Sequence, residues 1–300
     1  MSMILLLKTA LLGIVEGITE WLPISSTGHL ILVGNVLNPG MSDAFMEMFN
    51  VVIQLGAILA VVVLYFKKLW PFHLKRNAPE RSWFANPASK GAAAGFQRLA
   101  DNYLHMDRIV LWLKIAVSCI PAVVIGLPLD DWLEEHMHKP VPVALMLILY
   151  GVLFILIELW NKKRTPRVVR IRSILWRDAL LIGLFQVLAL IPGTSRSGAT
   201  ILGGILIGLS RTVAAEYTFY LAIPTMVGAS LMKLVKFGLH FTGTEAMVLL
   251  VGMLVSFAVS ILAIRFLMSY IKKHDFRVFG WYRIALGALV LILVAAGVAL

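Results

Sequence analysis

The chain has 300 residues, of which 60% are hydrophobic and only 14% are charged. A soluble domain must cover its surface with polar groups, and this composition cannot supply enough of them, which excludes the soluble classes of protein. Apolar runs recur along the whole sequence, so residues 1–300 are predicted to form a single membrane domain. The only cysteine, Cys119, excludes a disulfide within the chain.

The net charge of +11 is confined to the connections between apolar runs. Lysine and arginine dominate three of them, 67–108, 161–177 and 272–278. The connection 129–140 instead carries four acids, which are Asp130, Asp131, Glu134 and Glu135. Basic loops of membrane proteins face the cytoplasm, so 129–140 and both termini are predicted to lie outside. The same distribution argues against nucleic-acid binding.

In chain order, an interrupted apolar stretch over 2–36 comes first, and a second one covers 178–209. Every other apolar run is long enough to cross a bilayer as a helix. These six predicted spans are 44–66, 109–128, 141–160, 213–235, 246–271 and 279–300. The fold class is therefore an all-α polytopic membrane protein.

Polar residues break each interrupted stretch near its middle, at 23–29 and at 192–198. Proline ends a helix and glycine permits a tight reversal, while serine and threonine cap the helix that resumes. Each half is too short to cross the membrane alone. Both stretches are therefore predicted to be re-entrant helix-turn-helix hairpins.

The two hairpins also resemble each other in sequence. Gly13-Ile14-Val15-Glu16 before the first break parallels Gly183-Leu184-Phe185-Gln186 before the second. Three spans separate the hairpins, so they must enter from opposite faces, as in the inverted repeats of transporters. Repeat one covers about 1–160 and repeat two about 178–300. Exposed backbone at that depth requires a wet cavity where the two breaks meet.

The residues at the breaks indicate phosphate chemistry. Glu16 and Glu20 share one helix face, and carboxylates in a membrane are functional by default. Arg196 lies where the second helix resumes, among hydroxyl-bearing residues. A helix N-terminus, its amides and a guanidinium together describe a phosphate site.

Two motifs then become recognisable. Glu16-Gly17-x-x-Glu20 followed by Leu22-Pro23-x-Ser25-Ser26-Thr27-Gly28-His29 resembles the glutamate-rich motif of undecaprenyl-pyrophosphate phosphatases, the bacitracin-resistance family. Pro192-Gly193-x-Ser195-Arg196-Ser197-Gly198-x-Thr200 is similar to the second motif of that family. The resemblance implies an enzyme of the bacterial cytoplasmic (inner) membrane that hydrolyses undecaprenyl pyrophosphate to undecaprenyl phosphate and inorganic phosphate. That step recycles the lipid carrier of peptidoglycan synthesis and confers bacitracin resistance.

The resemblance and the residue types together suggest roles for the site. The catalytic candidates are Glu16, Glu20, Ser26, His29 and Arg196. The candidate phosphate-binding residues are Ser25, Thr27, Gly28, Gly193, Ser195, Ser197, Gly198 and Thr200. Ser26 is the preferred nucleophile, with Glu20 or His29 as its base. The alternative is a water activated by His29.

Glu16 and Glu20 could also hold Mg²⁺ or Ca²⁺, because hard cations prefer carboxylates and bridge phosphate oxygens. The partners expected are a polyprenyl pyrophosphate and bacterial membrane lipids, with a homodimer left open. The active site is expected to open to the outer, periplasmic side. The rival interpretation is a lipid flippase or secondary transporter, since those proteins also use broken helices in inverted repeats.

Overall fold

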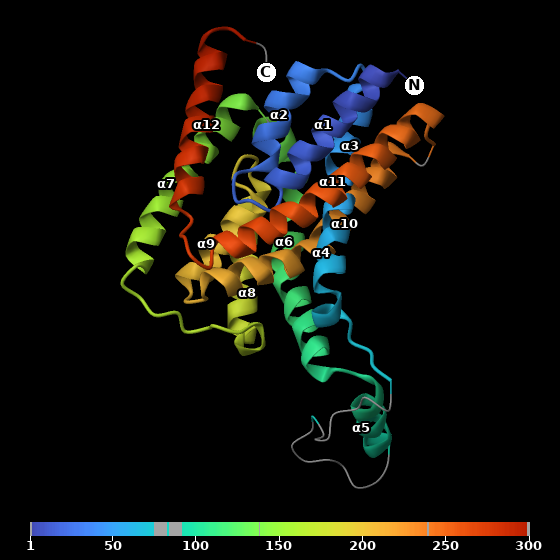
Figure 1. Cartoon of the computed structure of the whole chain (residues 1–300), viewed down its shortest axis with the longest axis vertical. Coiled ribbons are helices and arrows are strands. Elements are labelled where there is room, and N and C mark those ends of the chain that lie inside the picture. Colours follow the sequence, from blue (N-terminus) through green and yellow to red (C-terminus); the bar gives the residue numbers. More distant parts are fainter. Residues whose placement is uncertain (1, 75–82, 84–91, 138, 239, 299–300) are drawn as a thin grey trace.

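The computed structural model describes residues 2–74, 83, 92–137, 139–238 and 240–298 (Figure 1). Its regular structure is helical, as the apolar composition predicts, and the described part contains no strand beyond two isolated bridges. The α-helices are α1 (Met3–Thr19), α2 (Ser26–Leu37), α3 (Asp43–Val52), α4 (Gln54–Leu69), α5 (Ala92–Tyr103), α6 (Met106–Met137), α7 (Pro140–Asn161), α8 (Trp176–Val187), α9 (Arg196–Leu206), α10 (Arg211–Phe237), α11 (Gly243–Tyr270) and α12 (Arg277–Ala295). Two 3₁₀ turns, η2 (Ile171–Ser173) and η3 (Leu188–Leu190), flank α8.

The six predicted spans are confirmed. Within the described residues, six helical segments are long and apolar enough to cross a membrane. They are Asp43–Leu69, Met106–Leu129, Pro140–Asn161, Arg211–Phe237, Gly243–Tyr270 and Arg277–Ala295. The chain is therefore a multi-pass membrane protein.

Two predicted connections contain helix. α6 continues past its apolar part to Met137, so most of the acidic connection 129–140 is helical. The predicted cytoplasmic loop 67–108 includes the amphipathic helix α5. Residues 75–82 and 84–91 of that loop lie outside the described part of the chain. The end of α6 and the helix α5 are both less apolar than the neighbouring spans, so a search for apolar runs in the sequence did not detect them.

Both interrupted stretches form a helix, a break and a second helix, with none of the four helices longer than the 17 residues of α1. The resuming helices begin in the same way. Ser25 and Ser195 are their N-caps, each with φ of 72°, and each hydroxyl accepts a hydrogen bond from the amide three residues on. Positive φ is uncommon outside glycine. Its occurrence at both serines gives the two breaks the same local geometry.

Helices from the two halves of the chain pack against each other (Figure 1). α1 packs on α11, whereas α8 packs on α6, and α7 pairs with α12. In the predicted repeat, α1 corresponds to α8 and α6 corresponds to α11. The pairing of α1 with α11 is therefore the counterpart of the pairing of α8 with α6, as the predicted repeat requires. The re-entrant course of the hairpins and the inverted repeat stay predictions.

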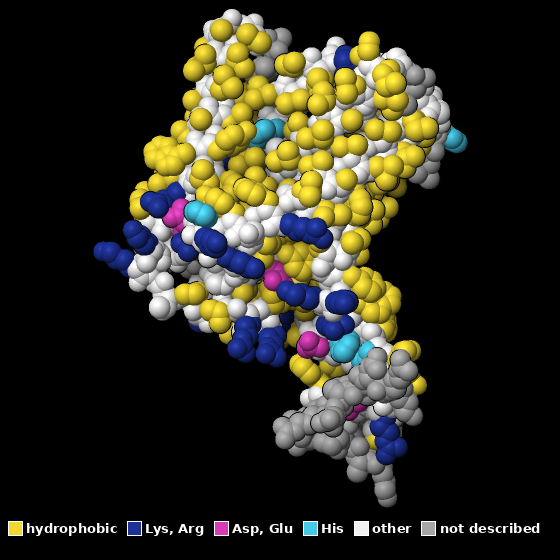
Figure 2. Space-filling model, viewed as in Figure 1, with side chains coloured by type: hydrophobic (Ala, Val, Ile, Leu, Met, Phe, Trp, Pro, Cys, Tyr) yellow, Lys and Arg dark blue, Asp and Glu magenta, His cyan; other side chains and the backbone are white. Residues whose placement is uncertain are grey.

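The charged residues separate along the long axis of the molecule. Both termini lie at one end, and the connections predicted to be cytoplasmic lie toward the other (Figure 1). Hydrophobic side chains cover most of the visible surface near the termini, while lysine and arginine gather toward the opposite end (Figure 2). This arrangement agrees with a membrane protein whose basic loops share one face.

The α7–α12 contact depends on glycine. A Cβ added to Gly151 would lie 2.7 Å from the carbonyl oxygen of Gly280, and a Cβ on Gly280 would lie 2.7 Å from that of Gly151. Small residues permit this close approach of membrane helices. We expect Gly151→Ala to destabilise the protein by about 1–3 kcal/mol, because the backbone must shift to admit the methyl group.

Thermal unfolding of the detergent-purified protein measures this effect, and Gly228→Ala is its control. Gly228 lies inside α10, and an added Cβ there would meet nothing within 4 Å. This variant should be as stable as the parent or slightly more stable, because alanine is the better helix former. Equal melting temperatures for the two variants would contradict the assigned contact.

Candidate active site

The two breaks lie against each other, and Glu20 is the residue at which they join. Glu20 caps the end of α1 and is buried. Its backbone oxygen accepts a hydrogen bond from the Ser197 hydroxyl at 3.1 Å, across 177 residues of sequence. The structure thus brings together the two motifs that the sequence placed in separate hairpins.

Both side-chain oxygens of Glu20 accept hydrogen bonds at this junction. Ser26 donates from Oγ to Oε2 at 2.8 Å, and Arg196 donates from Nη2 to Oε1 at 3.2 Å. One carboxylate therefore contacts the predicted nucleophile and the predicted phosphate-binding cation. The contact with Ser26 has the distance that proton transfer from a hydroxyl to a base requires.

Arg196 begins α9 and is held from two sides. Its Nη1 donates to the carbonyl oxygen of Thr218 on α10 at 3.0 Å, which complements the bond from Nη2 to Glu20. Its Nε is buried and has no hydrogen-bond partner in the described structure. The guanidinium is thus fixed in orientation, and 13% of the side chain stays exposed. A planar fork of donors suits a phosphate.

Several predicted phosphate-binding residues have internal partners. The amides of Gly28 and Gly198 are occupied by the Ser25 and Ser195 caps. Thr200 donates to the backbone oxygen of Arg196 and also contacts Thr218, while Ser197 bonds to Glu20.

Gly193 has a structural reason for being glycine. Its φ is +90°, and an added Cβ would lie 2.5 Å from the carbonyl oxygen of Val143 on α7.

Some predicted site residues remain partly exposed, so a substrate can reach them. These are Ser26, Thr27, His29, Ser195 and Arg196.

His29 lies one turn into α2, with both ring nitrogens engaged. Nδ1 lies 2.7 Å from the carbonyl oxygen of Ser25, which can only accept, so Nδ1 carries a proton. In the neutral ring Nε2 is then the acceptor, and the Tyr282 hydroxyl lies 2.7 Å from it. Tyr282 also stacks on the ring, with 5.6 Å between centroids. Among the described contacts, Ser26 is joined to Glu20 and not to His29.

Arg283 on α12 supports both breaks, and the sequence analysis missed it. It is fully buried, and it donates from Nη1 to the carbonyl oxygen of Pro23 at 3.2 Å. From Nη2 it donates to the carbonyl oxygens of Gly193 and Thr194, each at 2.8 Å. One guanidinium therefore joins backbone from both hairpins. The signal was available, since an arginine inside the span 279–300 is costly unless it has a function.

Glu16 lies one turn before Glu20 on α1 and is fully buried. Neither of its side-chain oxygens has a hydrogen-bond partner within the described residues. Because it precedes Glu20 by four residues on the same helix, it lies on the same face and belongs to the same cluster. Gln186, at the equivalent place in the second hairpin, is also buried without a partner for its amide. An unpaired buried carboxylate requires compensation by a cation or a proton.

Comparison with known proteins identifies the family of the chain. The model of the family described as "Bacitracin resistance protein BacA" matches residues 9–289, and so includes both breaks and Arg283. The chain belongs to the bacitracin-resistance family. It is also 56% identical over 290 residues to proteins of Enterococcus faecalis and Lachnoclostridium phytofermentans, with 97% of each chain covered. A protein of Latilactobacillus sakei is equally similar, over 95% of this chain and 96% of its own.

All three relatives are named "Undecaprenyl-diphosphatase". The resemblance recognised from the two motifs is therefore confirmed over nearly the whole chain. The roles of individual site residues stay predictions.

Arg283 provides a test of how the family site is assembled. Arg283→Lys keeps the charge, but an ammonium on a shorter stem cannot hold carbonyl groups of both breaks in one plane. Losing one or two charged hydrogen bonds at about 1.5–3 kcal/mol each should lower kcat at least tenfold. Steady-state kinetics in detergent would measure this, with melting temperature and helical content measured in parallel.

Arg265→Lys is the matched control, because Arg265 lies exposed on α11. It should retain the kcat of the parent. If Arg283→Lys also did so, α12 would have no part in positioning the breaks.

Proposed function

We infer that this chain hydrolyses undecaprenyl diphosphate to undecaprenyl phosphate and inorganic phosphate. The observation that carries this inference is the contact of Glu20 with both Ser26 and Arg196, in a chain that matches the family along its length. A hydroxyl beside a base and an oriented guanidinium are the groups that phosphoryl transfer requires. The polyprenyl tail would lie in the membrane, outside the polar junction.

The contacts favour a two-step reaction. Ser26 Oγ attacks the terminal phosphorus and passes its proton to Glu20, while the bond to the bridging oxygen breaks and undecaprenyl phosphate leaves with that electron pair. A water then attacks the phosphorus of the phosphoserine, the bond between phosphorus and Oγ breaks, and Oγ takes back the proton held by Glu20 as inorganic phosphate leaves. Arg196 offers donors to the phosphoryl oxygens in both steps. One water is consumed, as hydrolysis requires.

The competing route has a water attack the phosphorus directly. His29 Nε2 would be the base, because Nδ1 is already protonated. The Tyr282 hydroxyl now occupies Nε2, so that hydrogen bond would have to open before a water could bind there. Glu20 needs no such rearrangement to reach Ser26, which is why the serine route is preferred.

Phosphate release from purified protein tests the assigned function. Detergent removes the two compartments that transport requires but leaves hydrolysis intact. We therefore expect stoichiometric phosphate and prenyl phosphate from a prenyl diphosphate in micelles. If lipid moved between leaflets of reconstituted vesicles without any phosphate release in micelles, the transporter alternative would replace this proposal.

A divalent cation is a further part of the proposal, and the residues present fit one in part. Glu16 offers two unpaired buried oxygens, and Glu20 lies one turn away. Among the described residues no cluster of three or more His, Cys, Asp or Glu side chains could hold a metal. The diphosphate would therefore have to supply further ligands. When bound, Mg²⁺ or Ca²⁺ would neutralise charge on the phosphate oxygens.

Metal binding by Glu16 can be tested without turnover. With a non-hydrolysable diphosphate present, Mg²⁺ or Ca²⁺ should raise the melting temperature of the parent, because a ligand stabilises the state that binds it. Glu16→Gln should remove most of this increase. An equal increase in both proteins would exclude Glu16 as a ligand.

The membrane orientation is proposed from the distribution of charge. The gathering of basic side chains at the end opposite the termini supports an outer location for the termini (Figure 2). The opening of the site toward the outer side stays a prediction. Cysteine labelling of intact cells should find residues 2 and 131 on that same side, and opposite sides would contradict it. A homodimer would be detected by crosslinking in native membranes.

A further inference from the structure

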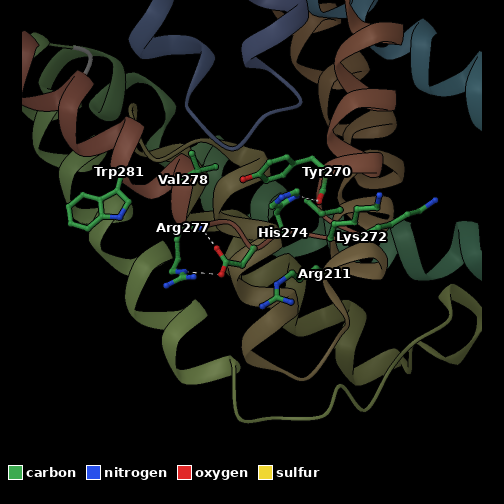
Figure 3. A pocket seen from close by; sticks show the side chains of 10 residues that line it. Arg211, Tyr270, Lys272, His274, Arg277, Val278 and Trp281 are labelled. Carbon is green, nitrogen blue, oxygen red and sulfur yellow. Dashed lines mark hydrogen bonds and ion pairs between the residues drawn. The ribbon is translucent and has the colours of Figure 1, made fainter.

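A basic pocket lies between the end of α11 and the beginning of α12, apart from the active site (Figure 3). Its volume is about 620 Å³. The wall residues that matter here are Arg211, Lys272, Lys273, His274, Arg277 and Trp281. None of them belongs to the motifs that carry the phosphatase function.

Two of the cations in this pocket are already neutralised. Arg277 donates from Nε to Asp275 at 2.8 Å, a contact drawn in Figure 3. Arg211 holds the fully buried carboxylate of Glu158, with Nη2 and Oε2 2.5 Å apart. Lys272 and Lys273 are exposed, and no carboxylate pairs with either within the described chain. The pocket therefore has an uncompensated positive charge that an anion can neutralise.

The position of the pocket indicates which kind of anion it binds. α11 ends at Tyr270 and α12 begins at Arg277, so the pocket lies where two membrane spans reach the water. One wall is apolar, since Val278 and Trp281 are 50% and 63% exposed. Above it in the view, hydrophobic side chains cover the surface (Figure 2). Tryptophan at a span end is typical of the lipid headgroup level.

We propose that this pocket binds the phosphodiester headgroup of an anionic phospholipid in the leaflet that contacts the basic loops. Lys272 and Lys273 would donate to the phosphate oxygens, and Trp281 with Val278 would contact the glycerol and the first acyl carbons. Paired lysines at a membrane surface attract anionic lipids in this way. A soluble phosphate would need the cations but gain nothing from the apolar wall.

Native mass spectrometry of the full-length protein in neutral detergent tests this site. The probes are phosphatidylglycerol and phosphatidylcholine at equal concentration, and we expect preferential retention of phosphatidylglycerol. The double variant K272Q/K273Q should bind it roughly tenfold more weakly, because both unpaired cations are lost. An excess of inorganic phosphate should not displace the lipid. A photoactivatable phosphatidylglycerol should label residues 270–281 of the unaltered protein.

R170Q/R172Q is the matched control, because it removes two exposed cations from another predicted cytoplasmic connection, and neither arginine lines this pocket. It should retain phosphatidylglycerol like the parent, and both variants should retain phosphate release in micelles. Equal losses in the two variants, or none in K272Q/K273Q, would overturn the site. Displacement by inorganic phosphate would instead identify a soluble-anion site and overturn the lipid. Failure of phosphate release in the parent would refute the proposed enzyme without affecting this result.

Discussion

Ser26→Ala should abolish turnover almost completely if Ser26 is the nucleophile. Its Oγ donates to Glu20 at 2.8 Å, and alanine removes both the attacking atom and this contact. Glu20→Gln should be equally severe, and the double variant no worse than either single one, because residues that act as a unit are not additive. Parent enzyme quenched during turnover should carry a phosphate on Ser26, which peptide mass spectrometry would locate.

Thr27→Val is the comparison, because it removes a neighbouring hydroxyl that is predicted only to bind phosphate. Loss of one charged hydrogen bond, about 1.5–3 kcal/mol, corresponds to roughly a ten- to hundredfold effect. If Ser26→Ala fell in that range and no phosphoenzyme were trapped, water would be the nucleophile. The serine route would then have to be abandoned in favour of His29 as the base.

Arg196→Lys should lower kcat by roughly 10²–10⁴-fold while the protein stays folded. Lysine keeps the charge but cannot reach Thr218, Glu20 and a phosphate oxygen at once, so two charged hydrogen bonds are lost. The measurement is steady-state phosphate release from a prenyl diphosphate, with helical content recorded for each variant.

Arg211→Lys distinguishes a loss of stability from a loss of catalytic activity. Arg211 holds buried Glu158 with both Nε and Nη2, at the end of the molecule where the basic loops gather. We expect a lower melting temperature with a much milder effect on turnover, because breaking a buried pair destabilises the fold. Similar, near-native rates for Arg196→Lys and Arg211→Lys would remove Arg196 from the site.

Much of the fold could be predicted because a bilayer restricts what a chain can do. A hydrocarbon core demands long apolar helices, so each of the six spans carries a signal in its own residues. The sequence signals of the two breaks are equally local, because proline, glycine and capping serines act on the neighbouring backbone. Ser25 and Ser195 confirm this, because both are N-caps with the same positive φ.

Contacts between residues far apart in the sequence could not be predicted from such local signals. The charge of Arg283 inside an apolar span indicated that it has a role, but only packing shows that it donates to both breaks. Tyr282 is likewise joined to His29 across 253 residues of sequence. The predicted phosphate ligands Ser197 and Thr200 turned out to bond within the protein, because a hydroxyl near a helix start has several equivalent uses.

The sequence alone determined the membrane class, the six spans, the two breaks and the chemical types that meet at them, because each depends on composition or on residues close along the chain. The tertiary structure decided that Glu20 joins Ser26 to Arg196, and that Glu16 is left without a partner. It also decided that α12 supplies the guanidinium behind both breaks. Hydrogen bonds depend on distance and direction in space, and packing of helices far apart in sequence sets both.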